Sequence, residues 1–277
     1  MENLNNLLKR HNLSLKKAFG QNFLSDQSLL DEIVDCAGIT ENDTVLEIGC
    51  GAGTLTRAIA KKAKKVVGYE IDTRLKPVLN ETLAEFNNVE IVFSDVMKNK
   101  IEDVEKKLGE QYTLVANLPY YITTPIIMRF VEQAKAVKAL VVMVQEEVAI
   151  RLASSPNTTD YGAITVGINL RGNTEIVLRV PREKFTPAPN VDSAVIKIDI
   201  DKDKFVGVDL DKVRNVVKCA FSSRRKMLVN NLMNTLKLSR EQANNALERA
   251  NISLTARAEN LSAQDYVVLT QALDKGV

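Results

Sequence analysis

The sequence predicts an α/β protein, in which a mostly parallel sheet of seven strands is covered by helices and followed by a small all-helical domain. From about residue 27 to residue 145, short β-rich runs alternate with stretches of helical periodicity, a pattern typical of parallel sheets covered on both faces. From about residue 210 to residue 273, apolar residues recur at helical spacing only. A charged stretch lies between the two patterns, so we place a boundary near residue 205, with domains at 1–204 and 205–277.

The elements of the predicted sheet follow one another in a regular order. A first helix begins after Ser25 or Asp26, either of which can cap it. Strands are then predicted at 45–48, 66–71, 89–93, 112–116 and 140–144. Helices are predicted between them at 55–63, 74–86, 101–108 and 125–133. Three more β-rich runs, at 164–170, 175–180 and 194–200, have no long helix between the last two, so we expect an antiparallel hairpin to close the sheet.

The helical domain carries its own start signals. Ser239 is followed three residues later by Gln242, and Ser262 is followed in the same way by Asp265. Each pair has the spacing of a capping box, in which two side chains satisfy backbone N–H groups at the first turn of a helix. The two pairs therefore predict where the last two helices begin.

The composition excludes several classes of protein. With 45% hydrophobic and 26% charged residues, the chain is ordinary globular material, and its longest clean apolar run, 139–144, is too short to span a bilayer. The polar N-terminal stretch has no hydrophobic signal core, so we expect a cytoplasmic protein without a membrane partner. Three cysteines at unrelated spacings and a single histidine, His11, predict no disulfide framework, no metal site and no serine–histidine–aspartate triad. The oligomeric state leaves no mark on the sequence, and a monomer is the default expectation.

Basic residues gather near the two ends of the chain, although the net charge is only +2. Between Lys212 and Arg240 there are eight basic residues and no acidic one, and the N-terminal leader is also rich in lysine and arginine. Such basic ends are typical of polyanion contacts, with nucleic acid as the first candidate. A solvated helix face is the alternative, and charge alone does not decide between them. The candidate RNA-binding residues are Lys16, Lys17, Arg224, Arg225 and Lys226.

A glycine-rich turn follows the first strand. Gly49, Gly51 and Gly53 lie between a strand and a helix, which brings backbone N–H groups close to a ligand. Their G-x-G-x-G spacing differs from the G-x-G-x-x-G of folds that bind dinucleotide pyrophosphates. Glu47, just ahead of the turn, favours a cationic ligand over an anionic one. The turn therefore predicts a nucleotide-like ligand without phosphates.

Two further acidic residues end the next two strands. Glu70 ends the second strand, at about the interval where an acid accepts both ribose hydroxyls. Asp95 ends the third strand, where a carboxylate can meet an adenine amino group. Either acid alone would be read as a solvated strand end. Together with the glycine turn, and in this order, they predict S-adenosylmethionine as the ligand.

The segment Asn117-Leu118-Pro119-Tyr120 comes directly after the fourth strand. An adenine amine is a poor nucleophile because its lone pair is delocalised, so a protein that methylates it must position it and stabilise positive charge on the nitrogen. The Asn117 side-chain oxygen and a backbone carbonyl can accept the two amine hydrogens, and Pro119 leaves its own carbonyl out of the sheet ladder. The Tyr120 ring can stack on the base, which contributes about 1–3 kcal/mol. No general base is needed, which fits a chain with one histidine. A plain turn after a buried strand would explain the Asn-x-Pro but not the tyrosine.

Six of the fourteen aromatic residues fall in or beside these motif-like segments: Phe19, Phe23, Tyr120, Tyr121, Phe185 and Phe221. A base that is taken out of its stack needs aromatic partners, and single-stranded RNA is recognised in this way. Some of the six belong to the core, with Phe23 and Phe221 as the first candidates.

Six blocks in order resemble one family, the ribosomal RNA adenine dimethyltransferases of the KsgA type. The blocks are FGQNFL (19–24), EIGCGAG (47–53), NLPY (117–120) with ITTP (122–125), FTPAP (185–189) with VDSAV (191–195), FSSRRK (221–226) and RAENLS (257–262). The resemblance implies a Rossmann-like class I S-adenosylmethionine-dependent methyltransferase fold. It also implies dimethylation of two adjacent adenosines in the hairpin loop near the 3′ end of 16S rRNA, on the assembling small (30S) ribosomal subunit.

The resemblance also implies roles for individual residues. The implied cofactor-binding residues are Asn22, Leu24, Gly49, Gly51, Glu70, Ile71, Asp95, Val96 and Asn117. The implied catalytic residues are Asn117, Leu118, Pro119, Tyr120 and Phe185, with Tyr120 and Phe185 on either side of the target adenine. The chain departs from the family pattern at Tyr121, where asparagine is usual, and at Cys50, where proline is frequent. Neither departure is expected to abolish activity, although Tyr121 bears on how the loop closes on the base.

Four alternatives remain at this point. A sister class methylates one adenosine of large-subunit rRNA, but it usually has isoleucine at the position of Leu118 and lacks the Phe-Thr-Pro-x-Pro block. DNA adenine methyltransferases normally carry two prolines in the corresponding motif. A nicotinamide-dependent oxidoreductase is disfavoured by the glycine spacing. From a different class, the chain would act chiefly as a ribosome-assembly factor that binds RNA.

Overall fold

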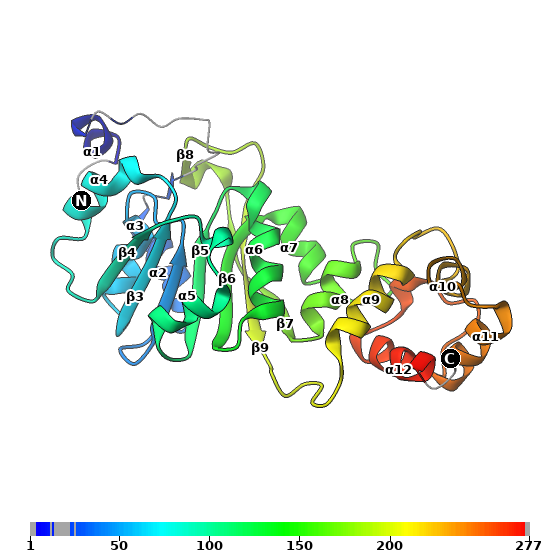
Figure 1. Cartoon of the computed structure of the whole chain (residues 1–277). Helices are drawn as coiled ribbons and strands as arrows, with labels where there is room; N and C mark the ends of the chain where they lie inside the picture. The colour runs from blue at the N-terminus through cyan, green and yellow to red at the C-terminus, as the bar shows by residue number, and fades with distance from the viewer. Residues whose placement is uncertain (1–3, 12, 14–22, 25, 275–277) are drawn as a thin grey trace. The chain divides into compact units, whose positions relative to one another are not determined.

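The computed structural model describes residues 4–11, 13, 23–24 and 26–274 (Figure 1). The chain forms two compact units. The first contains Met1–Ala149 and Glu175–Ile200, and the second contains Ile150–Thr174 and Asp201–Val277. The sequence prediction placed a single boundary near residue 205, close to the third of the three crossings between the units. It was wrong for 150–174, which it assigned to the first domain.

The first unit is built on the predicted seven-stranded sheet, whose strand order is β4-β3-β2-β5-β6-β9-β7. The strands are β2 (Thr44–Ile48), β3 (Lys65–Glu70), β4 (Val89–Phe93), β5 (Tyr112–Asn117), β6 (Val137–Gln145), β7 (Gly172–Val180) and β9 (Ser193–Ile200). The pairs β2–β3, β2–β5, β3–β4 and β5–β6 are parallel, whereas β9 is antiparallel to β6. A separate two-stranded sheet pairs β1 (Phe23–Leu24) with β8 (Phe185–Thr186). The mostly parallel sheet with an antiparallel edge is therefore confirmed.

Helices cover this sheet (Figure 1). The helices described in this unit are α1 (Leu4–Arg10), α2 (Gln27–Cys36), α3 (Thr54–Ala60), α4 (Lys76–Thr82), α5 (Ile101–Leu108), α6 (Tyr120–Gln133) and α7 (Glu146–Leu152), whose last three residues belong to the second unit, with 3₁₀ turns η2 (Thr73–Leu75), η3 (Val96–Lys98) and η4 (Arg182–Lys184). The carboxylate of Asp26 accepts hydrogen bonds from Ser28 N and Leu29 N, so Asp26 caps α2 as predicted. Buried valines of β2, β3, β5 and β6 pack with apolar residues of α2 and α3 in one core cluster.

Two predicted helices differ in extent from those observed. Helix α6 begins at Tyr120, five residues before the predicted start at 125, so the Asn117–Tyr120 segment leads straight from a strand into a helix. The predicted helix at 74–86 is divided into η2 and α4 and ends at Thr82. In both places the boundary depends on tertiary packing, which the local apolar spacing does not report.

The second unit is helical. It consists of α8 (Ala163–Asn169), α9 (Leu210–Ala220), α10 (Leu228–Leu236), α11 (Arg240–Arg249), η5 (Ala258–Asn260) and α12 (Ala263–Asp274). Both predicted capping boxes are confirmed: Ser239 Oγ accepts from Gln242 N at 3.1 Å, and Ser262 Oγ accepts from Asp265 N at 3.2 Å.

The predicted strand at 164–170 is wrong, because this segment forms α8. Its β-branched residues favour a strand locally, but Val166 and Leu170 are four residues apart and therefore share one helix face. Both are fully buried in the core of the second unit, together with Tyr161. Burial against α9 and α12 outweighs the local preference, which also explains why 150–174 belongs to this unit.

Candidate active site

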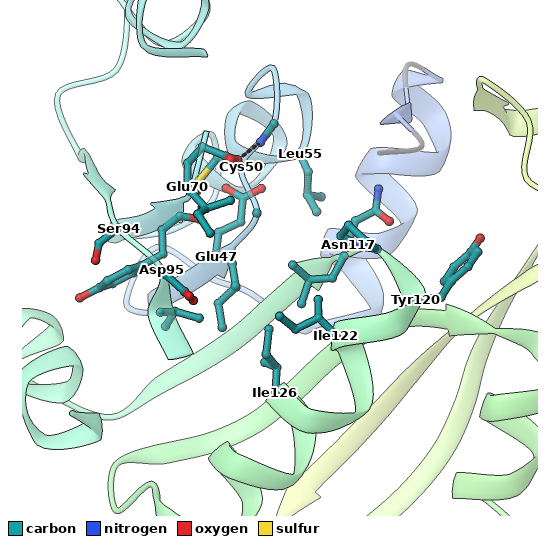
Figure 2. Close-up of a pocket in the computed structure, with 18 of the residues that line it drawn as sticks. Glu47, Cys50, Leu55, Glu70, Ser94, Asp95, Asn117, Tyr120, Ile122 and Ile126 are labelled. Carbon is teal, nitrogen blue, oxygen red and sulfur yellow. Dashed lines mark hydrogen bonds between the residues drawn. The ribbon is translucent and has the colours of Figure 1, made fainter. Parts of the chain in front are cut away.

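A pocket in the first unit lies where the carboxyl ends of β2, β3, β4 and β5 meet the starts of α3 and α6 (Figure 2). This is the expected place for a ligand in an open α/β sheet. The lining residues are Leu24, Glu47, Ile48, Gly49, Cys50, Gly51, Thr54, Leu55, Tyr69, Glu70, Ile71, Ser94, Asp95, Val96, Asn117, Leu118, Pro119, Tyr120, Tyr121, Ile122 and Ile126. Every predicted cofactor-binding residue lines it except Asn22, which lies outside the described residues.

The glycine turn is shaped by its backbone. Gly49 has φ +80°, a left-handed conformation that L side chains rarely adopt, and its N–H donates to Tyr69 O at 2.8 Å. A Cβ atom on Gly49 would lie 2.8 Å from Leu118 Cδ2, so the turn approaches the Asn117–Tyr120 segment closely. The N–H of Gly51 donates to Glu70 Oε2, also at 2.8 Å. The turn is thus held between β3 and the segment after β5.

Glu70 is 2% exposed, and its burial raises the pKa of the carboxyl group. Its Oε2 accepts from Gly51 N and its Oε1 accepts from Asp72 N at 2.8 Å. A carboxylate has about four acceptor positions, so these two bonds orient the group and leave acceptor capacity on both oxygens. Asp95 is half-buried, and its Oδ1 accepts from Met97 N at 2.9 Å, which caps η3.

Glu47 lines the same pocket; the sequence indicated that it favours a cationic ligand, but it was not among the predicted cofactor-binding residues. It is 1% exposed, and burial, together with the nearby carboxylate of Glu70, raises its pKa to about 7. Among the described residues, nothing donates a hydrogen bond to its Oε2 atom. The signal in the sequence was an acidic residue inside an otherwise apolar strand, which is unusual in a fully buried position.

The segment after β5 differs in how its two backbone carbonyls are occupied. The Pro119 carbonyl accepts from Ile122 N and from Thr123 Oγ1, each at 3.1 Å, so it is occupied by the first turn of α6 and is not left for a ligand. The carbonyl therefore lies outside the sheet ladder, as the sequence predicted, but α6 starts immediately after the proline and occupies it. In the described part of the chain, no hydrogen bond reaches the carbonyl of Leu118, which lines the pocket.

The two predicted stacking residues are not brought together. Tyr120 is half-buried at the pocket, and its hydroxyl lies 2.8 Å from Ser193 Oγ; Figure 2 shows its ring beyond Asn117, away from the strand-end carboxylates. Phe185 does not line the pocket. It pairs with Leu24 in the β1–β8 sheet and is only 4% exposed within the hydrophobic core, so its place beside the target adenine stays a prediction.

Several lining residues were missed or were noted only as departures. Ile122 and Ile126 are four residues apart on α6 and present one apolar face to the pocket, but the helix was predicted to start too late to show this. Tyr121 is 73% exposed and lines the pocket. Cys50 is buried, and a Cβ atom on Gly68 would collide with its sulfur, so Gly68 makes room for the cysteine.

The predicted RNA-binding residues separate into three groups. Lys16 and Lys17 lie outside the described residues. Arg224 donates to the carbonyls of Thr159, at 2.7 Å, and of Tyr161, at 3.1 Å, inside the second unit. The exposed side chains of Arg225 and Lys226 make no hydrogen bond or ion pair within the part of the chain that the structure describes. Of the three RNA-binding candidates that the structure describes, only Arg225 and Lys226 therefore expose a charged group that makes no hydrogen bond or ion pair within the described chain.

Two basic residues of the N-terminal leader also contact an acidic side chain of the first unit. Arg10 and His11 both contact the carboxylate of Glu81 on α4, His11 Nε2 at 2.7 Å.

Over the described residues, no group of three or more His, Cys, Asp or Glu side chains is arranged to hold a metal ion. None of the described helices is long and apolar enough to cross a membrane.

Comparisons with known proteins connect this site to one family. The model of the ribosomal RNA adenine dimethylase family matches residues 12–275. Ribosomal RNA small subunit methyltransferase A of Alkaliphilus metalliredigens is 44% identical over 269 residues, which cover 96% of this chain and 94% of that protein. The protein of the same name from Clostridioides difficile is 42% identical, with 98% of this chain and 95% of that protein covered.

Two solved structures are similar over nearly the whole chain. A dimethyladenosine transferase from Plasmodium falciparum has a TM-score of 0.79 at 26% identity, with 92% of this chain and 98% of that chain covered. The 23S rRNA methyltransferase ErmE has a TM-score of 0.71 at 28% identity, with 91% and 100% covered. Because the family model and these relatives match almost every residue, the chain belongs to the ribosomal RNA adenine dimethylase family.

Proposed function

We propose that this protein transfers methyl groups from S-adenosylmethionine to two adjacent adenosines in the hairpin loop near the 3′ end of 16S rRNA, and that it does so on the small (30S) ribosomal subunit during its biogenesis. The proposal rests on the observation that one and the same pocket is lined by the carboxylates of Glu70 and Asp95 and by the segment Asn117–Tyr120. Relatives at 42% and 44% identity are named small subunit methyltransferases, which supports the small subunit as the substrate. We further propose that the protein acts as a monomer in the cytoplasm, where these subunits assemble.

A large-subunit substrate is the closest alternative, since ErmE has the same fold. Leu118 and the Phe-Thr-Pro-x-Pro block at 185–189 count against it, as the sequence indicated. A test that separates dimethylation from single methylation is nucleoside analysis of treated small subunits. We expect N6,N6-dimethyladenosine at two adjacent positions, and monomethyladenosine alone after prolonged reaction would overturn the proposal.

The residues of the pocket fit S-adenosylmethionine, which would supply an electrophilic methyl group when bound. The positive charges of the donor suit Glu47, whose buried carboxyl group has an unpartnered oxygen. Glu70 keeps acceptor capacity on both oxygens for the two ribose hydroxyls. Asp95 can accept from the adenine amino group, and the 59% exposed side chain of Ile71, with Val96, offers apolar surface to the ring.

The acceptor side of the reaction uses the segment after β5. The side-chain oxygen of Asn117 and the carbonyl of Leu118 can accept the two hydrogens of the adenine amine. These bonds favour a geometry in which the nitrogen lone pair is no longer delocalised into the ring and can attack the methyl group. They also stabilise the positive charge that develops on nitrogen. The product ammonium loses its proton to water. Tyr120 offers a ring for stacking, whereas the buried Phe185 offers no open face in this arrangement.

The raised pKa of Glu47 predicts a pH dependence of both stability and donor binding. Between its ordinary value of 4.5 and its folded value of about 7, the folded chain holds a proton that the unfolded chain has released. The free energy of unfolding therefore falls as the pH rises through this window. A cationic donor favours the carboxylate, so its affinity should rise by about tenfold from pH 6 to pH 8.

Titration calorimetry with S-adenosylmethionine across this pH range checks the prediction. Glu47→Gln should bind the donor more weakly and with a smaller pH dependence. Its free energy of unfolding should decline less between pH 4.5 and pH 7, where the buried Glu70 carboxyl group still contributes. A pH profile that is the same in Glu47→Gln and in the wild type would assign the titration to another group.

The basic triplet predicts two different mutant phenotypes. Arg224→Gln removes two hydrogen bonds to the 159–161 loop and should lower the free energy of unfolding by about 1–3 kcal/mol. The double change Arg225→Gln and Lys226→Gln should leave stability unchanged, weaken binding to small subunits and lower the slope of log affinity against log salt by about 2. Urea unfolding and filter binding at several salt concentrations separate the two. If the double variant kept the wild-type affinity for small subunits and the wild-type salt dependence, Arg225 and Lys226 would belong to a solvated face and not to an RNA-binding surface.

A further inference from the structure

The block VDSAV, at 191–195, is one of those that carry the family resemblance, and the proposed reaction steps do not involve it. It forms the start of β9, where Ser193 pairs with Gln145 at the end of β6. Ser193 is fully buried, whereas its neighbour Asp192 is exposed. Successive side chains of a strand point to opposite sides, so the two residues contact different segments.

Ser193 contacts Tyr120. The two hydroxyl oxygens are 2.8 Å apart, and either can donate. Because Ser193 has no exposed surface, water does not replace this bond when it is lost. Burial raises the pKa of the Tyr120 phenol, so the hydroxyl stays protonated at neutral pH. The bond fixes the hydroxyl end of the Tyr120 side chain, while the first turn of α6 fixes its backbone.

Asp192 holds the start of β9 by contacts that do not involve Ser193. Its carbonyl accepts from Glu146 N at 3.1 Å, and its Oδ1 accepts from Arg182 N at 3.0 Å. Together with the pairing of β9 with β6, these bonds fix the backbone at Ser193. Removal of the Ser193 hydroxyl should therefore release the Tyr120 side chain without moving the strand.

We propose that Ser193 is a positioning residue for the reaction, which acts by holding the ring of Tyr120 at one angle to the target base. The proposal rests on the proposed function, in which Tyr120 stacks on the adenine. Stacking geometry decides where the amine lies relative to the incoming methyl group, and small displacements of reacting atoms are costly. Ser193 should thus affect the rate of methyl transfer and leave the binding of S-adenosylmethionine unchanged.

The test compares Ser193→Ala, Tyr120→Phe and the double variant in single-turnover methyl transfer to small subunits. Each single change removes one side of the same hydrogen bond, so each should lower the rate about fivefold to tenfold. The double variant should be no slower than either single variant. Donor affinity should stay within about twofold of wild type, since neither hydroxyl contacts the donor side of the pocket. Multiplying effects in the double variant, or a wild-type rate for Ser193→Ala, would overturn the proposal.

Tyr266→Phe serves as the matched control. The Tyr266 hydroxyl is also buried and donates to the Ala258 carbonyl at 2.9 Å, in the second unit. Its removal should lower stability without lowering the transfer rate. If Tyr266→Phe slowed transfer as much as Ser193→Ala, the effect of Ser193 would be one of general stability, and the proposal would fail.

A spectroscopic arm does not depend on the identity of the substrate. In protein with ¹³C-ζ-labelled tyrosine, the Tyr120 resonance is identified by its loss in Tyr120→Phe. Ser193→Ala should shift and broaden that resonance and leave that of Tyr266 in place. An unmoved Tyr120 resonance would contradict the proposal. Wild-type protein that methylates no small subunit would contradict the proposed function instead, and the resonance would still decide the role of Ser193.

Discussion

Asn117→Ala is expected to lower methyl transfer by about a hundredfold to a thousandfold, the range found when one preorganised hydrogen-bond partner of a transition state is removed. Asn117 ends β5 and lines the pocket between the strand-end carboxylates and Tyr120 (Figure 2). Its side-chain oxygen is the acceptor that the adenine amine needs, and the side chain carries none of the predicted phosphate contacts. Affinity for small subunits should therefore stay close to that of the wild type.

Two companion variants make the Asn117 result specific. Asn117→Asp keeps an acceptor oxygen at the same place and should retain more activity than Asn117→Ala. Asn42→Ala changes an exposed asparagine before β2 and should behave as the wild type. Single-turnover transfer of labelled methyl groups, beside binding titrations, checks all three. Unchanged turnover in Asn117→Ala would end the mechanism proposed for the acceptor side.

Gly49→Ala is expected to lower both S-adenosylmethionine affinity and turnover by about tenfold to a hundredfold. A side chain at φ +80° costs about 1–2 kcal/mol, which alone corresponds to a factor of about 5 to 30. The added methyl group would also lie 2.8 Å from Leu118 Cδ2, so the Leu118 side chain must move away from the turn. Because Leu118 belongs to the acceptor segment, a change on the donor side should disturb the amine-binding side as well.

Gly109→Ala controls for the general loss of stability that a side chain at positive φ causes. Gly109 has the same φ of +80° at the end of α5, but a Cβ atom there would meet nothing within 4 Å. It should therefore lose stability without losing donor affinity. Calorimetric titration of both variants at a temperature where each is folded provides the comparison. Equal donor affinities in Gly49→Ala and Gly109→Ala would show that neither the conformation of Gly49 nor its close approach to Leu118 affects donor binding.

The sequence could predict the donor side of the site because it depends on a rule of topology. Glu70 and Asn117 end strands β3 and β5, and Gly49 and Asp95 come shortly after β2 and β4. The carboxyl ends of parallel strands meet at one edge of the sheet. Once the strands were predicted, their last residues had to be neighbours. The pocket contains all four of these residues.

The parts that sequence reasoning missed depend on long-range packing. Phe185 is buried because β8 pairs with β1, which is far away in the sequence, and no local pattern reports that pairing. The helix at 163–169 has the β-branched residues of a strand, and only the core of the second unit determines its form. Arg224 looks like its neighbours Arg225 and Lys226 in the sequence, yet its side chain is held by two carbonyls of the 159–161 loop.

The most direct test of the central claim uses tritiated S-adenosylmethionine with small and large ribosomal subunits from cells that lack this activity. We predict that label enters the RNA of small subunits as dimethyladenosine, with two methyl groups on each of two adjacent adenosines, and that large subunits stay unlabelled. Label in large-subunit RNA would contradict this account and move the chain to the class of large-subunit methyltransferases. No label in either particle, with tight binding to small subunits, would contradict it as well and leave a binding factor with a methyltransferase fold.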